Sequence, residues 1–293
     1  MKTLFRLLIL GAVIGIGVFW FVTRPAPLDP DFAAGQSGDA EAGETVFTAA
    51  GCASCHAAPE AEDKLVLAGG YAFASDFGTF YAPNISPGAA GIGGWTLPEF
   101  ARAVTQGVSP AGQHYYPAFP YNAYQHLTNG DVADLYAYMQ TLPASEEASK
   151  PHEVGFPFNV RRLLGGWKTL FMTDSYVLTD VPTPELERGR YLVEALAHCG
   201  ECHTPRDGLG GLQRDLWLSG APNPSGKGTI PNITPGGLDW SESDLVYYFE
   251  SGFTPDYDSV GGSMAAVVEN LAKLPESDRQ AIAAYLKAVP AVP

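Results

Sequence analysis

The sequence predicts an all-α fold in which a short apolar helix precedes two similar helical domains that are joined by a linker. Three observations lead to this architecture: an apolar N-terminus, an internal repeat, and helical spacing of apolar residues within each copy of the repeat. Strand signals are weak throughout the chain. We therefore expect an N-terminal anchor or signal with the start of a tether over residues 1–27, domains over 39–145 and 183–290, and an interdomain linker over 146–182.

The length and charge of the chain bound its size and its partners. The 293 residues suffice for about two ordinary domains, and a hydrophobic content of 46% provides enough apolar surface for buried cores. The formal net charge of −15 argues against nucleic acid as a partner, because phosphate binding needs a basic surface. Docking to a basic patch on another protein, or solubility alone, would suit such a surface.

The first residues resemble an export signal or a membrane anchor. Lys2 and Arg6 precede an apolar run over residues 7–22, and the positive-inside rule places the two cations in the cytoplasm. No clean small-x-small cleavage site follows Val22, and Trp20 would suit a membrane interface. An uncleaved anchor is therefore favoured over a cleaved signal, and either one exports the domains to the periplasmic side of the inner membrane. The Pro- and Ala-rich residues 25–38 predict a flexible tether.

The two halves of the chain are copies of one another. Each copy contains a Pro-Asn-Ile turn, then a tryptophan followed after 12 residues by a glycine, and a closing helix that ends at a proline. In the first copy these features lie at 83–85, 95–107 and 131–143, and in the second at 231–233, 240–252 and 278–290. Each copy of about 100 residues is therefore predicted to be a small helical domain.

Each copy also contains a Cys-x-x-Cys-His motif. The motifs are Cys52-Ala-Ser-Cys55-His56 and Cys199-Gly-Glu-Cys202-His203, and they contain all four cysteines of the chain. This motif attaches haem c: two thioether bonds hold the porphyrin, and the adjacent histidine binds the iron from the proximal side. A zinc site of four cysteines is the alternative, but it does not require the two histidines, and the motifs lie 147 residues apart. We therefore predict two covalently bound haem c groups, with His56 and His203 as iron ligands.

The repeat also points to ligands on the distal side of each iron. Met264 lies 12 residues after Gly252, and its thioether is the distal ligand expected for an electron-transfer haem. The equivalent residue of the first copy is Phe119, which cannot bind iron. His114, five residues earlier, is the favoured substitute ligand, and an open five-coordinate iron is the main alternative. Met139 aligns with a leucine of the second closing helix and is predicted to be a core residue.

A further contact is predicted for each proximal histidine. Such histidines normally donate their other ring N–H to a carbonyl group. Pro83 and Pro231 offer carbonyls in rigid turns at a suitable separation from His56 and His203. A plain turn without this role is the alternative.

With these motifs the chain resembles the cytochrome c subunits of periplasmic membrane-bound dehydrogenases, which include alcohol, gluconate, aldehyde and isoquinoline oxidoreductase types. The resemblance rests on CASCH, YAPNISPGAAGIGGWTLPEF, HYYPAFPYNAY and DLYAYMQTLP in the first half, and on CGECH, IPNITP and the GGSM…YLKAVP ending in the second. It implies two tandem class-I-like cytochrome c domains. Many members of the family carry YPAMPY with methionine as a ligand, where this chain has YPAFPY.

The resemblance implies an electron-transfer subunit rather than a catalyst in its own right. Such a subunit would accept electrons from the catalytic subunit of a periplasmic dehydrogenase, or from another redox protein, and pass them to quinone or to another cytochrome. The alternative is a haem enzyme, of the peroxidase or thiosulfate-oxidising type, that uses an open first haem. A haem gas sensor is a third interpretation, and the sequence shows nothing like a signalling domain to support it.

The predicted linker contains a basic cluster in an acidic chain. Arg161, Arg162 and Lys168 lie within residues 156–172, where apolar residues are spaced loosely as an amphipathic helix. A strap that packs the two domains together is the favoured interpretation. A docking surface for a partner subunit or for the membrane is the alternative.

Overall fold

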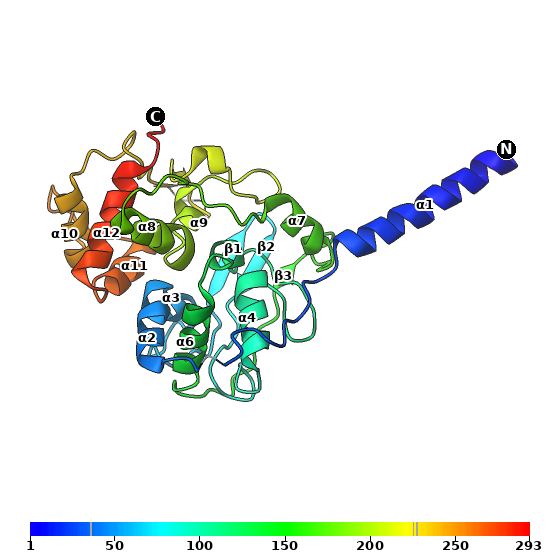
Figure 1. Ribbon diagram of the computed structural model, residues 1–293, viewed down its shortest axis with the longest axis horizontal. Coiled ribbons are helices and arrows are strands. Elements are labelled where there is room, and N and C mark those ends of the chain that lie inside the picture. Colours follow the sequence, from blue (N-terminus) through cyan, green and yellow to red (C-terminus); the bar gives the residue numbers. More distant parts are fainter. Residues whose placement is uncertain (36, 225, 227) are drawn as a thin grey trace.

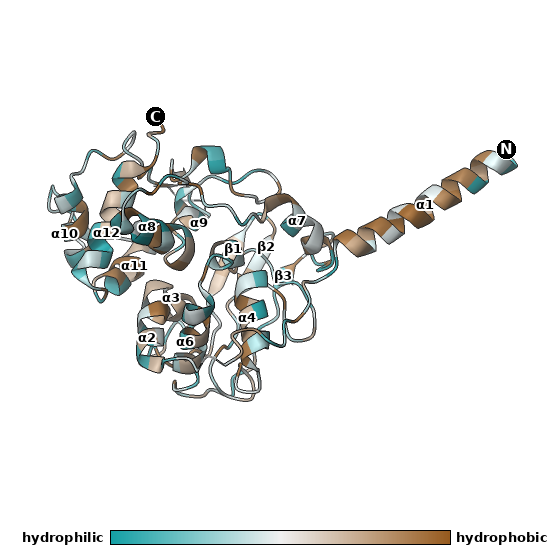
Figure 2. Ribbon diagram, in the orientation of Figure 1, coloured by the Kyte–Doolittle hydropathy of each residue, from teal (hydrophilic) through white to brown (hydrophobic). Residues whose placement is uncertain are grey.

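The computed structural model describes residues 1–35, 37–224, 226 and 228–293. Helix α1 (Lys2–Val22) projects from a mostly helical body, and none of its residues is buried (Figure 1). Figure 2 shows that apolar residues cover most of its length. Its 21 residues are long and apolar enough to cross a membrane. The chain then runs along the body before the next helix begins.

The first unit, which we define as residues 39–145, is built on two helices that cross closely. It contains α2 (Ala40–Ala49), α3 (Cys52–His56), α4 (Leu97–Gln106), α5 (Tyr121–Tyr124) and α6 (Asn129–Met139). Helices α2 and α6 pack against each other at Gly43, where a Cβ atom would lie 2.0 Å from the carbonyl oxygen of Asp134. Only glycine permits this approach, and the crossing buries Phe47, Leu135 and Met139 in the core.

The second unit, residues 183–290, repeats this crossing. It contains α8 (Pro184–Arg190), a π-helix η1 (Tyr191–Leu196), α9 (Gly200–His203), the 3₁₀ turn η2 (Arg214–Leu216), α10 (Glu242–Ser251), α11 (Met264–Leu271) and α12 (Glu276–Ala288). Helices α8 and α12 pack at Gly189, where a Cβ atom would lie 2.1 Å from the carbonyl oxygen of Ala281. The same glycine-dependent contact therefore joins the first and last helices of both units.

Helices α4 and α10 begin and end in the same way. Each begins with a capping box, formed by Thr96 with Glu99 in α4 and by Ser241 with Asp244 in α10. Each ends at a glycine in the left-handed conformation, Gly107 and Gly252, with φ angles of 59° and 75°. Local sequence signals therefore set both boundaries of this helix in both units.

Short strands accompany the helices, which the all-α prediction did not contain. Strands β1 (Ala72–Ser75), β2 (Gly78–Tyr81) and β3 (Glu153–Val154) form an antiparallel sheet, and β4 (Ala221–Pro222) pairs with β5 (Thr229–Ile230). The turn between β1 and β2 consists of Asp76 and Phe77, and Gly78, which follows it, has a φ of 129°. A Cβ atom at Gly78 would lie 2.3 Å from the carbonyl oxygen of Glu153 in β3. The fold is therefore mostly helical rather than all-α.

Residues between the units strap them together through helix α7 (Leu163–Phe171). On the first unit, Lys168 Nζ donates to the carbonyl oxygens of Gln106 and Gly107 at the end of α4. On the second unit, Trp167 Nε1 donates to the carbonyl oxygen of Leu209 at 3.0 Å. These contacts agree with the strap interpretation, because the amino group of Lys168 is bound inside the molecule.

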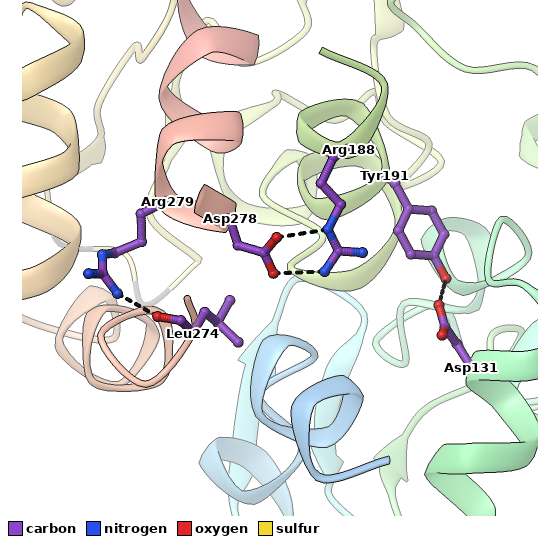
Figure 3. Close-up of polar contacts among 6 residues, drawn as sticks. All are labelled: Asp131, Arg188, Tyr191, Leu274, Asp278 and Arg279. Atoms are coloured by element: carbon purple, nitrogen blue, oxygen red, sulfur yellow. Dashed lines mark hydrogen bonds and ion pairs between the residues drawn. The ribbon is translucent and has the colours of Figure 1, made fainter. Parts of the chain in front are cut away.

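A polar cluster joins the two units directly (Figure 3). Tyr191, the first residue of η1, donates to the carboxylate of Asp131 in α6, and its oxygen accepts from the backbone N–H of Thr128 at 3.2 Å. Beside it, Arg188 forms a bidentate ion pair with the buried Asp278 of α12, with N–O separations of 2.9 and 2.7 Å. The start of α6 is thereby fixed against the start of the second unit.

Candidate haem sites

The two Cys-x-x-Cys-His motifs form equivalent short helices, α3 and α9. In α3 the Nδ1 atom of His56 lies 2.8 Å from the carbonyl oxygen of Pro83, and in α9 the Nδ1 atom of His203 lies 2.8 Å from that of Pro231. Both hydrogen bonds expected from the sequence are present. Because a carbonyl only accepts, Nδ1 must carry the proton, which leaves Nε2 of each ring with a free lone pair.

The chemistry of this donor set fits covalently bound haem. Burial lowers the pKa of His56 and of His203, so both rings are neutral near pH 7 and able to bind iron. Burial raises the pKa of Cys52 to about 12 and that of Cys199 to about 12, so these are neutral thiols in an enclosed setting. Each motif therefore supplies two thiols, which thioether formation needs, and beside them a neutral imidazole that can bind iron. The assignment of these residues as haem ligands stays a prediction.

The hairpin that follows α4 and α10 fixes the register between the two units. Four hydrogen-bonded or bridged pairs of the first unit recur in the second with an offset of 145 residues. They are Ser109 N to Gln113 O and Thr254 N to Asp258 O, Gly112 N to Ser109 O and Tyr257 N to Thr254 O, Tyr115 N to Gly107 O and Val260 N to Gly252 O, and the bridges Val108–His114 and Phe253–Ser259. In this register Phe119 is equivalent to Met264, and His114 is equivalent to Ser259.

The two predicted distal residues lie in different settings. Met264 is the first residue of α11 and is half-buried against the core of the second unit. His114 is only 3% exposed, and its Nε2 atom lies 3.0 Å from the carbonyl oxygen of Thr23, just after α1. Burial is the main cause that lowers the pKa of His114, so the ring is neutral and Nε2–H donates this bond. His114 is therefore engaged with the end of the N-terminal helix.

Aromatic side chains surround Phe119 beside the first motif. Its ring makes edge contacts with the rings of Tyr115, Tyr121 and Tyr124, at centroid separations of 6.2, 6.3 and 5.7 Å. The hydroxyl of Tyr124 donates to the carbonyl oxygen of Ala50 at 3.2 Å, two residues before the first cysteine of the motif. These tyrosines were not among the predicted site residues, although all three lie within HYYPAFPYNAY.

The two motifs meet at the junction between the units. Asn270 in α11 donates to the hydroxyl of Ser54 within the first motif at 3.0 Å. His198, which directly precedes the second motif, lies with Nε2 3.3 Å from the carbonyl oxygen of Ala50. The ring of His198 makes an edge contact with Tyr124, and its φ angle of 40° is in the left-handed region, which non-glycine residues rarely adopt. Nothing in the sequence around His198 indicates this cross-unit role.

A buried carboxylate holds the strap next to the second motif. Glu194 lies in the π-helix η1, is 4% exposed, and accepts from the backbone N–H groups of Val177 and Leu178 at 2.5 and 3.0 Å. It also accepts from the hydroxyl of Tyr285 at 2.7 Å. These three bonds satisfy a carboxylate that would otherwise be costly to bury.

Known proteins resemble the chain over almost its whole length. The family model for cytochrome c matches residues 40–143. A diheme cytochrome c-type protein of Cereibacter sphaeroides is 56% identical, over 96% of this chain and 95% of that protein. The fructose dehydrogenase cytochrome subunit of Gluconobacter japonicus is 39% identical, over 92% of this chain and 56% of its own length. The cytochrome c subunit of the quinone-dependent alcohol dehydrogenase of Gluconobacter oxydans is 34% identical, over 86% of this chain and 55% of its own length. The chain thus spans about half the length of these dehydrogenase subunits.

Proposed function

The chain belongs to the diheme cytochrome c family and is homologous to the cytochrome c subunits of membrane-bound dehydrogenases, and on this premise we propose that it accepts electrons from a periplasmic dehydrogenase and passes them to the respiratory chain. It carries two covalently bound haem c groups, and electron transfer is the function that this membership implies. The second unit is proposed to be a second cytochrome c domain. Its helix crossing, its capping box and its hairpin register support this, because they match those of the first unit.

The haem groups are proposed to be held by equivalent residues in the two units. Cys52, Cys55 and His56 would hold the first, and Cys199, Cys202 and His203 the second, with Met264 as a distal ligand of the second iron. When bound, each haem supplies a reversible one-electron couple at its iron. The carbonyls of Pro83 and Pro231 keep the protons on Nδ1 of the proximal histidines and fix the orientation of the rings.

One observation carries the electron-transfer proposal: the two haem-attachment segments lie side by side. Ser54 of the first motif contacts Asn270 of the second unit. His198, which directly precedes the second motif, contacts Ala50, which lies two residues before the first motif. A carrier that moves an electron from one haem to the other needs such proximity. The donor would be the catalytic subunit of a dehydrogenase or another redox protein, and the net charge of −15 suits a basic docking patch on it.

Helix α1 is proposed to remain as a membrane anchor that holds the body on the periplasmic side. Arg162 binds the end of the helix, since it donates to the carbonyl oxygen of Trp20 at 2.6 Å and to the hydroxyl of Thr23 at 2.8 Å, and its guanidinium covers the Trp20 ring. Thr23 is 3% exposed, and Gly165 of α7 leaves no room for a Cβ atom beside it. A chain cleaved after Thr23 would leave Arg162 and His114 without these partners.

The test is electron exchange between the two haems of the full-length, haem-loaded protein in detergent. After a pulse of a one-electron reductant, we expect an electron to pass between the haems at a rate that does not depend on protein concentration. His198→Asn, which keeps a residue that tolerates the left-handed backbone, is expected to slow this exchange, and the exposed Gln280→Ala is the matched control. An exchange rate proportional to protein concentration would contradict the proposal, because it would show that electrons pass only between molecules.

A further inference from the structure

We propose that the iron of the first haem has no protein ligand on its distal side, and that this position, beside Phe119, binds small neutral diatomic molecules such as carbon monoxide or nitric oxide. The inference goes beyond electron transfer. It rests on the proposed function only in taking the first motif as a haem site.

The hairpin register removes the distal ligand from its expected position. Four matched backbone pairs set the register over residues 107–115 and 252–260, and counting four residues on from there pairs Phe119 with Met264. Phenylalanine has no donor atom, so the position that supplies a thioether in one unit supplies a hydrocarbon ring in the other. His114 is equivalent to Ser259, five residues before the ligand position, and not to Met264.

The contacts of His114 engage it elsewhere. Its Nε2–H donates to Thr23, and its own carbonyl oxygen accepts from Arg161 Nη1 at 2.8 Å. Its Nδ1 atom is buried and has no hydrogen-bond partner among the described residues. The pocket that His114 lines is bounded by Pro25, Gln113, Arg161 and Arg162, all at the junction with α1, and no residue of the first motif lines it. Ligation of iron through Nε2 of this ring would break the contact that holds the end of α1.

The other donors near Phe119 are also committed. The hydroxyl of Tyr124 donates to Ala50 and that of Tyr121 donates to Tyr115, at 3.2 and 3.3 Å. Iron binds tyrosine as the phenolate, and burial raises the pKa of both tyrosines far above 10, so both stay neutral phenols. Met139 is 2% exposed in the α6 core, where it is equivalent to a core leucine of α12.

The surroundings select the chemical class of the ligand. Aromatic rings line the site around Phe119. An apolar wall does not solvate an anion, so neutral diatomics are the ligands of choice. Carbon monoxide adds to ferrous iron as a sixth ligand without any transfer of electrons or protons, so it is the cleanest probe.

The experiment is a carbon monoxide titration of the reduced, full-length protein in detergent, with haem quantified. We expect one carbon monoxide bound per two haems. Phe119→Met, which copies the residue of the second unit, is expected to abolish binding and to add a second thioether–iron charge-transfer band in the oxidised protein. The matched variant Met264→Phe is expected to raise the stoichiometry to two, and His114→Ala to leave it at one.

Two results would overturn the inference. The first is a wild-type protein that binds no carbon monoxide while His114→Ala binds one, which would make His114 the ligand. The second is a Phe119→Met protein that still binds one carbon monoxide and gains no thioether band, which would place Phe119 away from the iron. Neither result affects electron exchange between the haems, so failure here is distinguishable from failure of the proposed function.

Discussion

Replacing Gly189 with alanine should destabilise the second unit and leave the first unit intact. Gly189 is where α8 crosses α12, and an alanine Cβ would lie 2.1 Å from the carbonyl oxygen of Ala281 and 2.9 Å from the Cβ of Tyr285. Unstrained C–H···O contacts have C···O separations of about 3.3–3.6 Å, so the helices must separate by about 1 Å. The obstacle is helix backbone, which cannot rotate away as a side chain can.

The size of the effect follows from two opposing contributions. Overpacking of this kind costs about 1–3 kcal/mol and sometimes more, while alanine in place of glycine within a helix recovers up to about 1 kcal/mol. Because the contact is with backbone, we expect the upper part of this range and a net loss of about 2 kcal/mol. For a unit of about 100 residues this corresponds to a fall in its unfolding midpoint of about 10 °C.

The assay follows thermal unfolding of the haem-loaded protein with a separate signal for each unit. The thioether–iron band reports on the second unit if Met264 binds iron, and carbon monoxide binding reports on the first. Gly43→Ala should lower the midpoint of the first unit instead, because its Cβ would lie 2.0 Å from Asp134 O. Gly130→Ala in α6 is the control, since the nearest atom to its Cβ lies 3.7 Å away. A stable Gly189→Ala protein, or one in which both midpoints fall equally, would refute the account of two separately packed units.

Two further predictions concern buried polar groups. Glu194→Leu should destabilise the second unit by about 3 kcal/mol or more, because it removes three hydrogen bonds to a buried carboxylate. Tyr285→Phe removes one of these bonds and also the bond that Trp217 Nε1 donates to the Tyr285 hydroxyl, so it should cost about 2 kcal/mol. Guanidinium unfolding of both variants checks this, and equal midpoints would contradict it. Burial is the main cause that lowers the pKa of His198 below 6.5, so the unfolded chain takes up a proton that the folded chain does not, and stability should fall as the pH falls below 6.5. His198→Asn should flatten this decline in unfolding midpoints measured across pH, and an unchanged slope would count against it.

Local signals predicted the parts of the fold that depend on neighbours in sequence. The closing helices were expected over 131–143 and 278–290, and the structure has Asn129–Met139 and Glu276–Ala288. Apolar spacing and the flanking prolines carry enough information for such boundaries. The β1–β2 hairpin was not predicted from the sequence. Its strands are four residues long, and a pattern of that length cannot be distinguished from a loop.

The remaining features depend on residues that are far apart in sequence. The contact of His114 with Thr23 joins residues 91 positions apart, and no periodicity encodes it. Spacing alone makes His114 a candidate distal ligand, and its contact with Thr23 becomes apparent only in three dimensions. The basic cluster of the linker is similar: Arg161, Arg162 and Lys168 suggest a docking surface in the sequence, yet each donates to a carbonyl within the molecule.

The two hairpins differ in what keeps them ordered, and this difference is consistent with the proposed open iron of the first unit. In the second unit the hairpin is largely exposed: Tyr257 at its tip is 83% exposed, and Ser259 is exposed as well. A bond from Met264 to iron would supply the constraint that packing does not. In the first unit the end of α1 covers His114, and Lys168 of the strap caps Gly107. Packing against the end of α1 and the strap therefore orders the first hairpin without help from iron, so a phenylalanine at position 119 costs it little order, as the proposed open iron requires.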